Sequence, residues 1–246
     1  MDILSIVGFF GAFVVLVVGC ILKGSTPSSL VGSAAFVIVI CGTTCSIMLQ
    51  TPKATFLHAL KMAKWVFKTP QTDNKALIAK IVEWSNAARK QGLLALEASV
   101  EMETDSFIKK GLQLLVDGAE PDMIRNVLEV EMGTQEHFDT QGAKVFEGMG
   151  IYAPTLGIIG AVLGLMAVMR NLADPSQLGH GISAAFIATV YGIGAANMFL
   201  LPMASKLKSI VAGQTRSREM LIEGLISISR GDNPRNIEAK LQGFFH

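Results

Sequence analysis

Residues 149–169 read MGIYAPTLGIIGAVLGLMAVM, a run of apolar and small residues without an Asp, Glu, Lys, Arg or His. A helix needs about 20 such residues to cross roughly 30 Å of hydrocarbon, so this run is long enough to span a bilayer. Because lipid offers no partner for a free N–H or C=O, a spanning backbone must be helical. The stretch therefore predicts a transmembrane helix.

Three further runs of this kind lie at residues 3–22, 30–49 and 181–204, and none contains Asp, Glu, Lys, Arg or His. Half of the 246 residues are hydrophobic, only 17% are charged, and the mean hydropathy is +0.46. Because the apolar residues come in blocks, the composition favours a membrane protein over a large soluble core. The first run lacks basic residues before it and is too long for a signal peptide, so we expect it to be a retained span.

The spans are joined in pairs by short polar turns, and a long polar segment separates the pairs. Lysines and arginines follow the second and fourth spans, which orients the long segment and both termini toward the cytoplasm. The sequence predicts an all-α membrane protein with four transmembrane helices in two hairpins and a helical cytoplasmic domain. The expected parts are hairpin one (1–50), the cytoplasmic domain (51–147), hairpin two (148–204) and a cytoplasmic tail (205–246).

Capping residues predict helices in the polar segments. Asp73 is suited to begin a helix that we expect to reach Ser99, and Gly118 is suited to end the next one. Pro121 fits the first turn of a further helix. We expect the tail to continue the fourth span as a helix, and Asn233 to begin a short final helix.

The spans themselves carry few polar groups. An ion carrier that works alone usually has an ionisable residue within the membrane, so this chain either moves no ions or borrows a carboxylate from a partner. Pro154 and Pro202 each remove one backbone donor, and Thr155 and Thr189 add hydroxyls. These residues could line an ion path, but kinks that serve packing and hydroxyls bonded to their own helix remain the commoner explanation.

Small residues predict close helix contacts in the second pair of spans, since they let backbones approach. They are Gly157, Gly160 and Gly164 in the third span and Ala184, Ala188, Gly192 and Ala196 in the fourth.

No motif for a nucleophile, a metal site or a phosphate-binding loop is present. Cys41 and Cys45 are one helical turn apart, but no His or carboxylate lies nearby, so we expect apolar packing there. The net charge of +1 gives no general attraction to nucleic acid. We therefore expect no enzyme activity, no metal, no cofactor and no nucleic-acid partner, with lipid around the spans.

Taken together, the motifs resemble the A-subunits of flagellar stators, the MotA/PomA family. Residues 153–161, APTLGIIGA, are similar to its A-P-x-x-G-x-x-G signature. Residues 189–202 contain T-x-Y-G, A-N and P in the family's order, and residues 89–97 match its R-x-x-G-x-x-x-L-E segment. The resemblance runs over nearly the whole chain.

The resemblance implies a function in the bacterial inner membrane. Family members form a ring, understood to be a pentamer, around a dimer of a B-subunit with a transmembrane Asp and a peptidoglycan-binding domain. Ion passage through this Asp is thought to turn the ring, and the cytoplasmic domain pushes on the rotor switch protein. The missing carboxylate would then come from the B-subunit.

The resemblance also implies roles for single residues. Pro154 and Pro202 resemble the prolines that couple ion flow to motion, and Thr155 and Thr189 belong to the ion path, with Thr189 facing the partner's Asp. Sodium-type members carry a second Thr at the position of Ala161, so the sequence favours protons, with Na⁺ as the alternative.

In the loop, Arg89 and Glu97 resemble the charged pair that engages the rotor; without the family, they would be assigned to a solvated face of one helix. Two other functions stay open. One is an ExbB/TolQ-like energiser of outer-membrane work, although that type has three spans. The other is a membrane scaffold that moves no ions.

Overall fold

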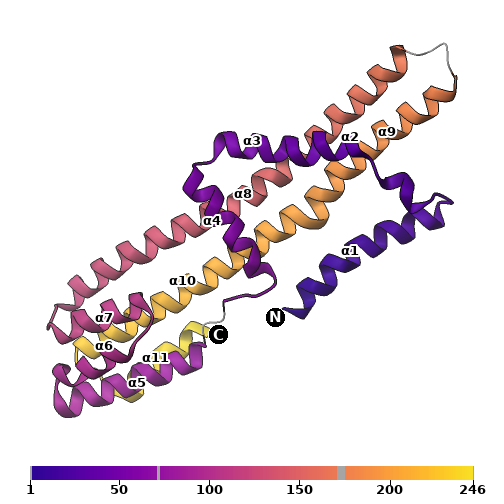
Figure 1. Cartoon of the computed structure of the whole chain (residues 1–246). Coiled ribbons are helices and arrows are strands. Elements are labelled where there is room, and N and C mark those ends of the chain that lie inside the picture. Colours follow the sequence, from indigo (N-terminus) through magenta and orange to yellow (C-terminus); the bar gives the residue numbers. More distant parts are fainter. Residues whose placement is uncertain (1, 71–72, 171–174, 246) are drawn as a thin grey trace. The chain divides into compact units, whose positions relative to one another are not determined.

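The structure is a computed structural model that describes residues 2–70, 73–170 and 175–245 (Figure 1). The chain divides into two compact units, Met1–Thr69 with Phe138–Ser209, and Pro70–His137 with Ile210–His246. Residues assigned to regular structure in the described ranges are all helical, and four helices are long and apolar enough to cross a membrane. The predicted fold class is confirmed.

Two long helices, α8 (Pro121–Arg170) and α10 (Leu201–Ser229), contribute residues to both units. The other elements of the first unit are α1 (Ile3–Leu22), η1 (Pro27–Leu30), α2 (Ser33–Phe36), η2 (Val37–Cys41), α3 (Gly42–Gln50), α4 (Lys53–Met62), η3 (Ala63–Val66), α9 (Pro175–Gly194) and η5 (Ala195–Leu200). The other elements of the second unit are α5 (Asn74–Gln91), η4 (Leu93–Leu96), α6 (Glu97–Met102), α7 (Ser106–Val116), α11 (Pro234–Gln242) and η6 (Gly243–Phe245).

Helix α1 coincides with the first predicted span at both ends. Asp2 caps it by accepting a hydrogen bond from the N–H of Leu4, and its carboxylate also pairs with Lys206 of α10. The helix that carries the fourth span begins earlier than the predicted residue 181, because α9 already begins at Pro175.

Two segments of the membrane spans are π-helical, η2 in the second span and η5 in the fourth. In η5, the N–H of Leu201 bonds to the carbonyl of Ala196, five residues back. Pro202 follows immediately, and a proline both lacks an N–H and collides with the preceding turn, so a widened turn relieves the conflict. No proline accounts for η2.

The capping predictions in the second unit are largely confirmed. The Asp73 carboxylate accepts the N–H of Ala76, and Asn233 caps α11. The helix from Asp73 does not reach Ser99, however. It ends at Gln91 because Gly92 adopts a φ of 84°, which directs the chain into η4 and α6.

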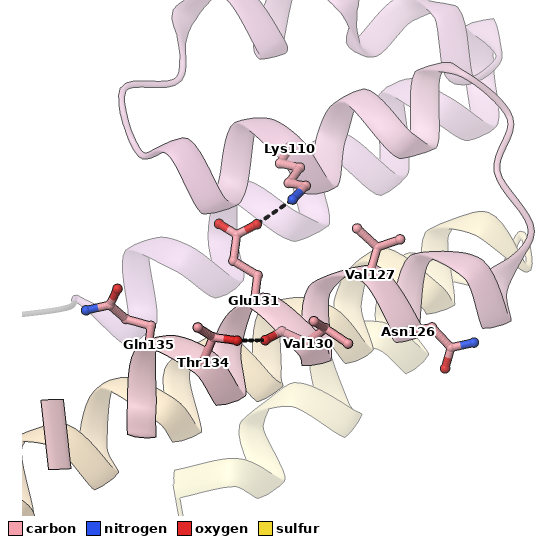
Figure 2. A pocket seen from close by; sticks show the side chains of 7 residues that line it. All are labelled: Lys110, Asn126, Val127, Val130, Glu131, Thr134 and Gln135. Carbon is pink, nitrogen blue, oxygen red and sulfur yellow. Dashed lines mark hydrogen bonds and ion pairs between the residues drawn. The ribbon is translucent and has the colours of Figure 1, made fainter. Parts of the chain in front are cut away.

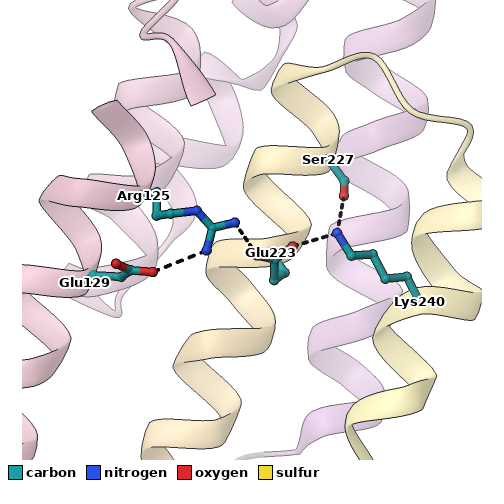
Figure 3. A network of polar contacts seen from close by, with 5 residues as sticks. All are labelled: Arg125, Glu129, Glu223, Ser227 and Lys240. Atoms are coloured by element: carbon teal, nitrogen blue, oxygen red, sulfur yellow. Dashed lines mark hydrogen bonds and ion pairs between the residues drawn. The ribbon is translucent and has the colours of Figure 1, made fainter. Parts of the chain in front are cut away.

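A hydrophobic core and an ion-pair network hold the second unit together. Its core residues include Ile81, Leu112 and Leu128, all fully buried. Glu223 of α10 accepts hydrogen bonds from Lys240 of α11, at 2.6 Å, and from Arg125 of α8 (Figure 3). One carboxylate therefore ties three helices together.

Replacing Glu223 with Gln is expected to lower the free energy of unfolding by about 1 kcal/mol at pH 7, since the pairs are partly exposed. Partial burial raises the pKa of Glu223, but hydrogen bonds from Lys240 and Arg125 outweigh it and hold the pKa below its ordinary value of 4.5. The pKa of this carboxyl group is lower in the folded chain than in the unfolded chain, so its ionisation stabilises the fold at any pH above the unfolded-state pKa. This stabilisation is lost as the pH falls through the folded-state pKa.

The measurement is thermal unfolding of the detergent-solubilised chain at pH 7 and pH 4. The wild type should lose more stability on acidification than Glu223→Gln. Glu219→Gln, one turn earlier at an exposed position without an ion pair to a described residue, is the matched control. If the wild type and Glu223→Gln lost the same stability on acidification, the assignment of a lowered pKa to Glu223 would be wrong.

Candidate functional site

Helices α8 and α9 pack backbone to backbone in the first unit (Figure 1). A Cβ added to Gly192 would lie 2.6 Å from the carbonyl oxygen of Ala153 and 3.2 Å from the Cα of Pro154. A Cβ added to Gly157 would lie 3.0 Å from the carbonyl oxygen of Ala188. Backbone atoms cannot move aside as a flexible side chain can, so both positions require glycine. The predicted close contact of the small residues is confirmed.

The same contact continues along both helices, with one correction. A Cβ on Gly160 would lie 2.8 Å from the Cβ of Ala188, and one on Gly164 would lie 3.2 Å from the Cα of Ala185. The prediction that Ala184 belongs to this face is wrong, because Ala184 is exposed while Ala185 is buried. Spacings of three and four residues both return to one helix face, so the sequence alone could not choose between them.

The two predicted ion-path threonines bond to their own helices. Thr155 is exposed and donates to the carbonyl of Tyr152 at 2.8 Å. Thr189 is half-buried and donates to the carbonyl of Ala185 at 3.3 Å. Each hydroxyl oxygen still has lone pairs for another partner. Ala161 lies half-buried on α8 and offers only a methyl group.

Pro202 lies elsewhere, against the first span. It lines a cavity of about 210 Å³ together with Phe9, Phe67, Phe199 and Lys206. The ring of Phe9 meets those of Phe199 and Phe67 edge to face, with centroids 5.1 Å and 5.7 Å apart. The five ion-path candidates therefore do not form one cluster within a single chain.

The two π-helical segments meet next to Pro154. Val39 of η2 and Ala196 of η5 are fully buried and form one cluster with Ala153 of α8. The sequence did not predict this arrangement. Pro202 was a signal for the widened turn in the fourth span, but the second span carries no such signal.

Arg89 and Glu97 stand on different helices of the second unit. Arg89 is in the last turn of α5, and Glu97 begins α6 after the turn at Gly92. Both side chains are exposed, and neither forms an ion pair with a described residue, while Leu96 between them is fully buried. The alternative that both residues lie on the solvated face of one helix is therefore wrong. The two exposed side chains instead lie on either side of the turn at Gly92, which separates α5 from α6.

A partly buried polar pair that the sequence did not reveal joins α4 to α8. The Nε2 of His58 lies 2.6 Å from a carboxylate oxygen of Asp139, and Asp139 is only 4% exposed. The His58 ring stacks on Phe138, with centroids 4.4 Å apart, and meets Trp65 edge-on. Because 81 residues separate the partners in the chain, no local pattern could have paired them.

A shallow groove of about 610 Å³ runs along α7 and α8 in the second unit (Figure 2). Lys110 of α7 bridges it to Glu131 of α8 at 2.6 Å, and Thr134 bonds to the carbonyl of Val130. The residues predicted to engage the rotor do not line this groove.

Residues 99–220 match the model of the MotA/TolQ/ExbB proton channel family. The chain is 40% identical to motility protein A of Bacillus subtilis (strain 168), covering 98% of this chain and 90% of that protein. It is 34% identical to chemotaxis protein PomA of Vibrio alginolyticus, covering 100% of this chain and 96% of that protein.

Solved structures agree with these sequence relatives. A chain in the structure of C. jejuni MotAB superposes with a TM-score of 0.96 at 33% identity, covering 100% of this chain and 96% of that chain. The flagellar MotAB stator complex from Bacillus subtilis gives a TM-score of 0.89 at 38% identity, covering 98% and 95%.

Proposed function

This chain belongs to the MotA/PomA family of flagellar stator A-subunits, and on that premise we propose that it forms an ion channel with a B-subunit and converts ion-motive force into torque. The observation that carries the proposal is the full-length similarity to chains of MotAB stator complexes. The family is one of channels and stators rather than of enzymes.

The B-subunit supplies the intramembrane carboxylate that the spans of this chain lack. It brings a transmembrane Asp for the ion and a peptidoglycan-binding domain that anchors the complex. Five copies of this chain surround a dimer of the B-subunit. A broad apolar surface on α8 and α9, which includes Ile158, Val162 and Phe186, is exposed in the single chain and is available for lipid, other copies or the partner helix.

The ion is a proton. Ala161 offers no oxygen where a sodium site would need one, and Thr189 faces the Asp of the partner. One elementary charge that falls through 100 mV releases about 2.3 kcal/mol, enough to bias packed states that differ by a few kcal/mol. Pro154, at the close contact with Gly192, and Pro202, against the first span, couple this energy to motion.

The second unit transmits the motion to the rotor switch protein. Arg89 and Glu97 support this role because both side chains are exposed and neither forms an ion pair with a described residue. Lysines and arginines follow the second and fourth spans, so this unit and both termini lie in the cytoplasm, with the spans in the inner membrane.

The test is the swimming speed of a strain without its own stator that expresses this chain with the matching B-subunit. We expect motility that collapses with a protonophore and is indifferent to Na⁺. Pro154→Ala and Thr189→Ala should abolish it while the A–B complex still purifies. Dependence on Na⁺ would overturn the proton assignment, and variants that swim normally would favour a scaffold.

If the wild-type chain restores no motility, the protein that co-purifies with it distinguishes a stator from an ExbB/TolQ-like energiser. A partner with a peptidoglycan-binding domain supports the stator. A TonB-like partner would contradict the proposal in favour of an ExbB/TolQ-like role.

A further inference from the structure

The cavity of about 210 Å³ that Pro202 lines has an occupant that the proposed function does not name. Its walls come from the start of α1, from the turn after α4 and from the part of the fourth span around Pro202. Ser5 and Lys206 are its polar lining residues, and the others are glycine or apolar. The rings of Phe9, Phe67 and Phe199 pack edge to face around it. The cavity therefore suits an apolar ligand with a polar group at one end.

The cavity lies near one surface of the membrane. Helix α1 begins at Ile3, and a helix rises 1.5 Å per residue, so Phe9 lies roughly 9 Å along the span. The other lining residues of α1, Ser5 and Gly8, lie closer to its start. With the N-terminus in the cytoplasm, as proposed above, the cavity sits just beneath the headgroups of the cytoplasmic leaflet. An apolar cavity at this depth suits the upper part of a lipid acyl chain.

Basic side chains lie beside the polar end of the cavity. Lys206 pairs with Asp2 and also donates to the hydroxyl of Ser5. The carbonyl of Phe67 accepts the N–H of Asp2 at 3.0 Å, which fastens the turn around Phe67 to the start of α1.

That turn carries two further lysines. Lys64 and Lys68 lie on either side of Phe67 in the chain, both are exposed, and neither forms an ion pair with a described residue. With Lys206, the three lysines outnumber the carboxylate of Asp2. Basic residues between membrane helices on the cytoplasmic side are suited to anionic lipid headgroups.

We propose that this cavity binds one anionic phospholipid of the cytoplasmic leaflet, with its acyl chain against Phe9 and Phe199 and its phosphate beside Lys64 and Lys68. A second copy of this chain fits less well, because basic residues follow its own second and fourth spans and would bring like charges to the same depth. The bound lipid would lie against Pro202, one of the residues proposed to couple ion flow to motion.

The test is photo-crosslinking of the purified full-length chain in phosphatidylcholine nanodiscs. The probe is phosphatidylglycerol with a diazirine on its acyl chain, and phosphatidylcholine with the same label is the reference. Mass spectrometry locates the crosslinks. We expect phosphatidylglycerol to label residues 5–9 and 198–206 about fivefold more than phosphatidylcholine does, the factor for one lysine near an anionic headgroup.

A pair of glycine variants tests the cavity itself. A Cβ added to Gly8 meets nothing within 4 Å, and leucine forms helix more readily than glycine, so Gly8→Leu should fold and fill the cavity. Its preference for phosphatidylglycerol should be lost. Gly11→Leu is the matched control, because Gly11 lies on the same helix in equally open space but does not line the cavity. This variant should label as the wild type does.

Charge variants test the headgroup site. Lys64→Gln/Lys68→Gln should reduce the labelling by phosphatidylglycerol to that by phosphatidylcholine. Asp2→Asn should increase it, because Asn also caps a helix but leaves Lys206 without its ion pair.

Equal labelling of the wild type by both lipids would overturn the proposal, and so would a preference that survives in Gly8→Leu. Crosslinks between two copies of the chain at residues 5–9 would identify a neighbouring copy as the occupant instead. The inference rests on the proposed orientation of the spans. Since no readout requires motility or a B-subunit, its failure is distinct from failure of the stator function.

Discussion

Gly192→Val is expected to abolish motility and to destabilise the folded chain by about 3 kcal/mol or more. The added Cβ alone would meet the carbonyl oxygen of Ala153 at 2.6 Å and the Cα of Gly157 at 3.0 Å. Relief requires that α8 and α9 move apart, which would also displace Pro154. Thermal unfolding of the solubilised chain and swimming speed are the measurements.

Gly194→Val is the matched control, because Gly194 lies on the same helix and a Cβ added there would meet nothing within 4 Å. Its stability should stay close to that of the wild type. If both valine variants were equally stable, the α8–α9 contact would not need glycine at position 192, and the close crossing described above would be wrong.

His58→Leu is expected to destabilise the chain by roughly 3 kcal/mol, the low end of the range for a broken buried pair. The substitution leaves the buried Asp139 carboxylate without its imidazole partner. The low end applies because the His58 side chain is 18% exposed and Asp139 keeps a further interaction. Thermal unfolding monitored by circular dichroism measures the loss.

Two further variants make this result specific. The double variant His58→Leu/Asp139→Leu should recover much of the lost stability, because it removes the charge together with its partner. His137→Leu, at a nearby exposed position, should change stability by less than about 0.5 kcal/mol. A double variant less stable than His58→Leu would show that the carboxylate is held mainly by other groups.

The spans and the helix caps could be predicted because their signals are local. Each apolar block carries its own length and composition, and Asp73 and Gly118 act within one or two turns. The break at Gly92 was missed because Gly92 lies in a run of residues that otherwise suit a helix. The positive φ of Gly92 and the packing of Leu96 into the core together select the corner there.

The candidate site was predicted only in part, for a related reason. The sequence indicated that small residues on α8 and α9 touch, but the choice between Ala184 and Ala185 depends on how the helices rotate. The pairing of His58 with Asp139 and the meeting of Val39 with Ala196 join distant segments. The roles of Pro154, Thr155, Ala161, Thr189, Pro202, Arg89 and Glu97 remain predictions, of which Pro154→Ala and Thr189→Ala test two.

The absence of charges from the four spans has a consequence for the evolution of this chain. An Asp or Lys at the centre of a span costs about 2.5–3.5 kcal/mol during insertion by the translocon, whereas exchange among small neutral residues costs far less. A methyl or a hydroxyl at positions such as 161 and 189 can therefore be exchanged without risk to biogenesis. Under the proposed function, a lineage could alter the ion that it uses by single neutral steps, while the costly carboxylate stays on the B-subunit.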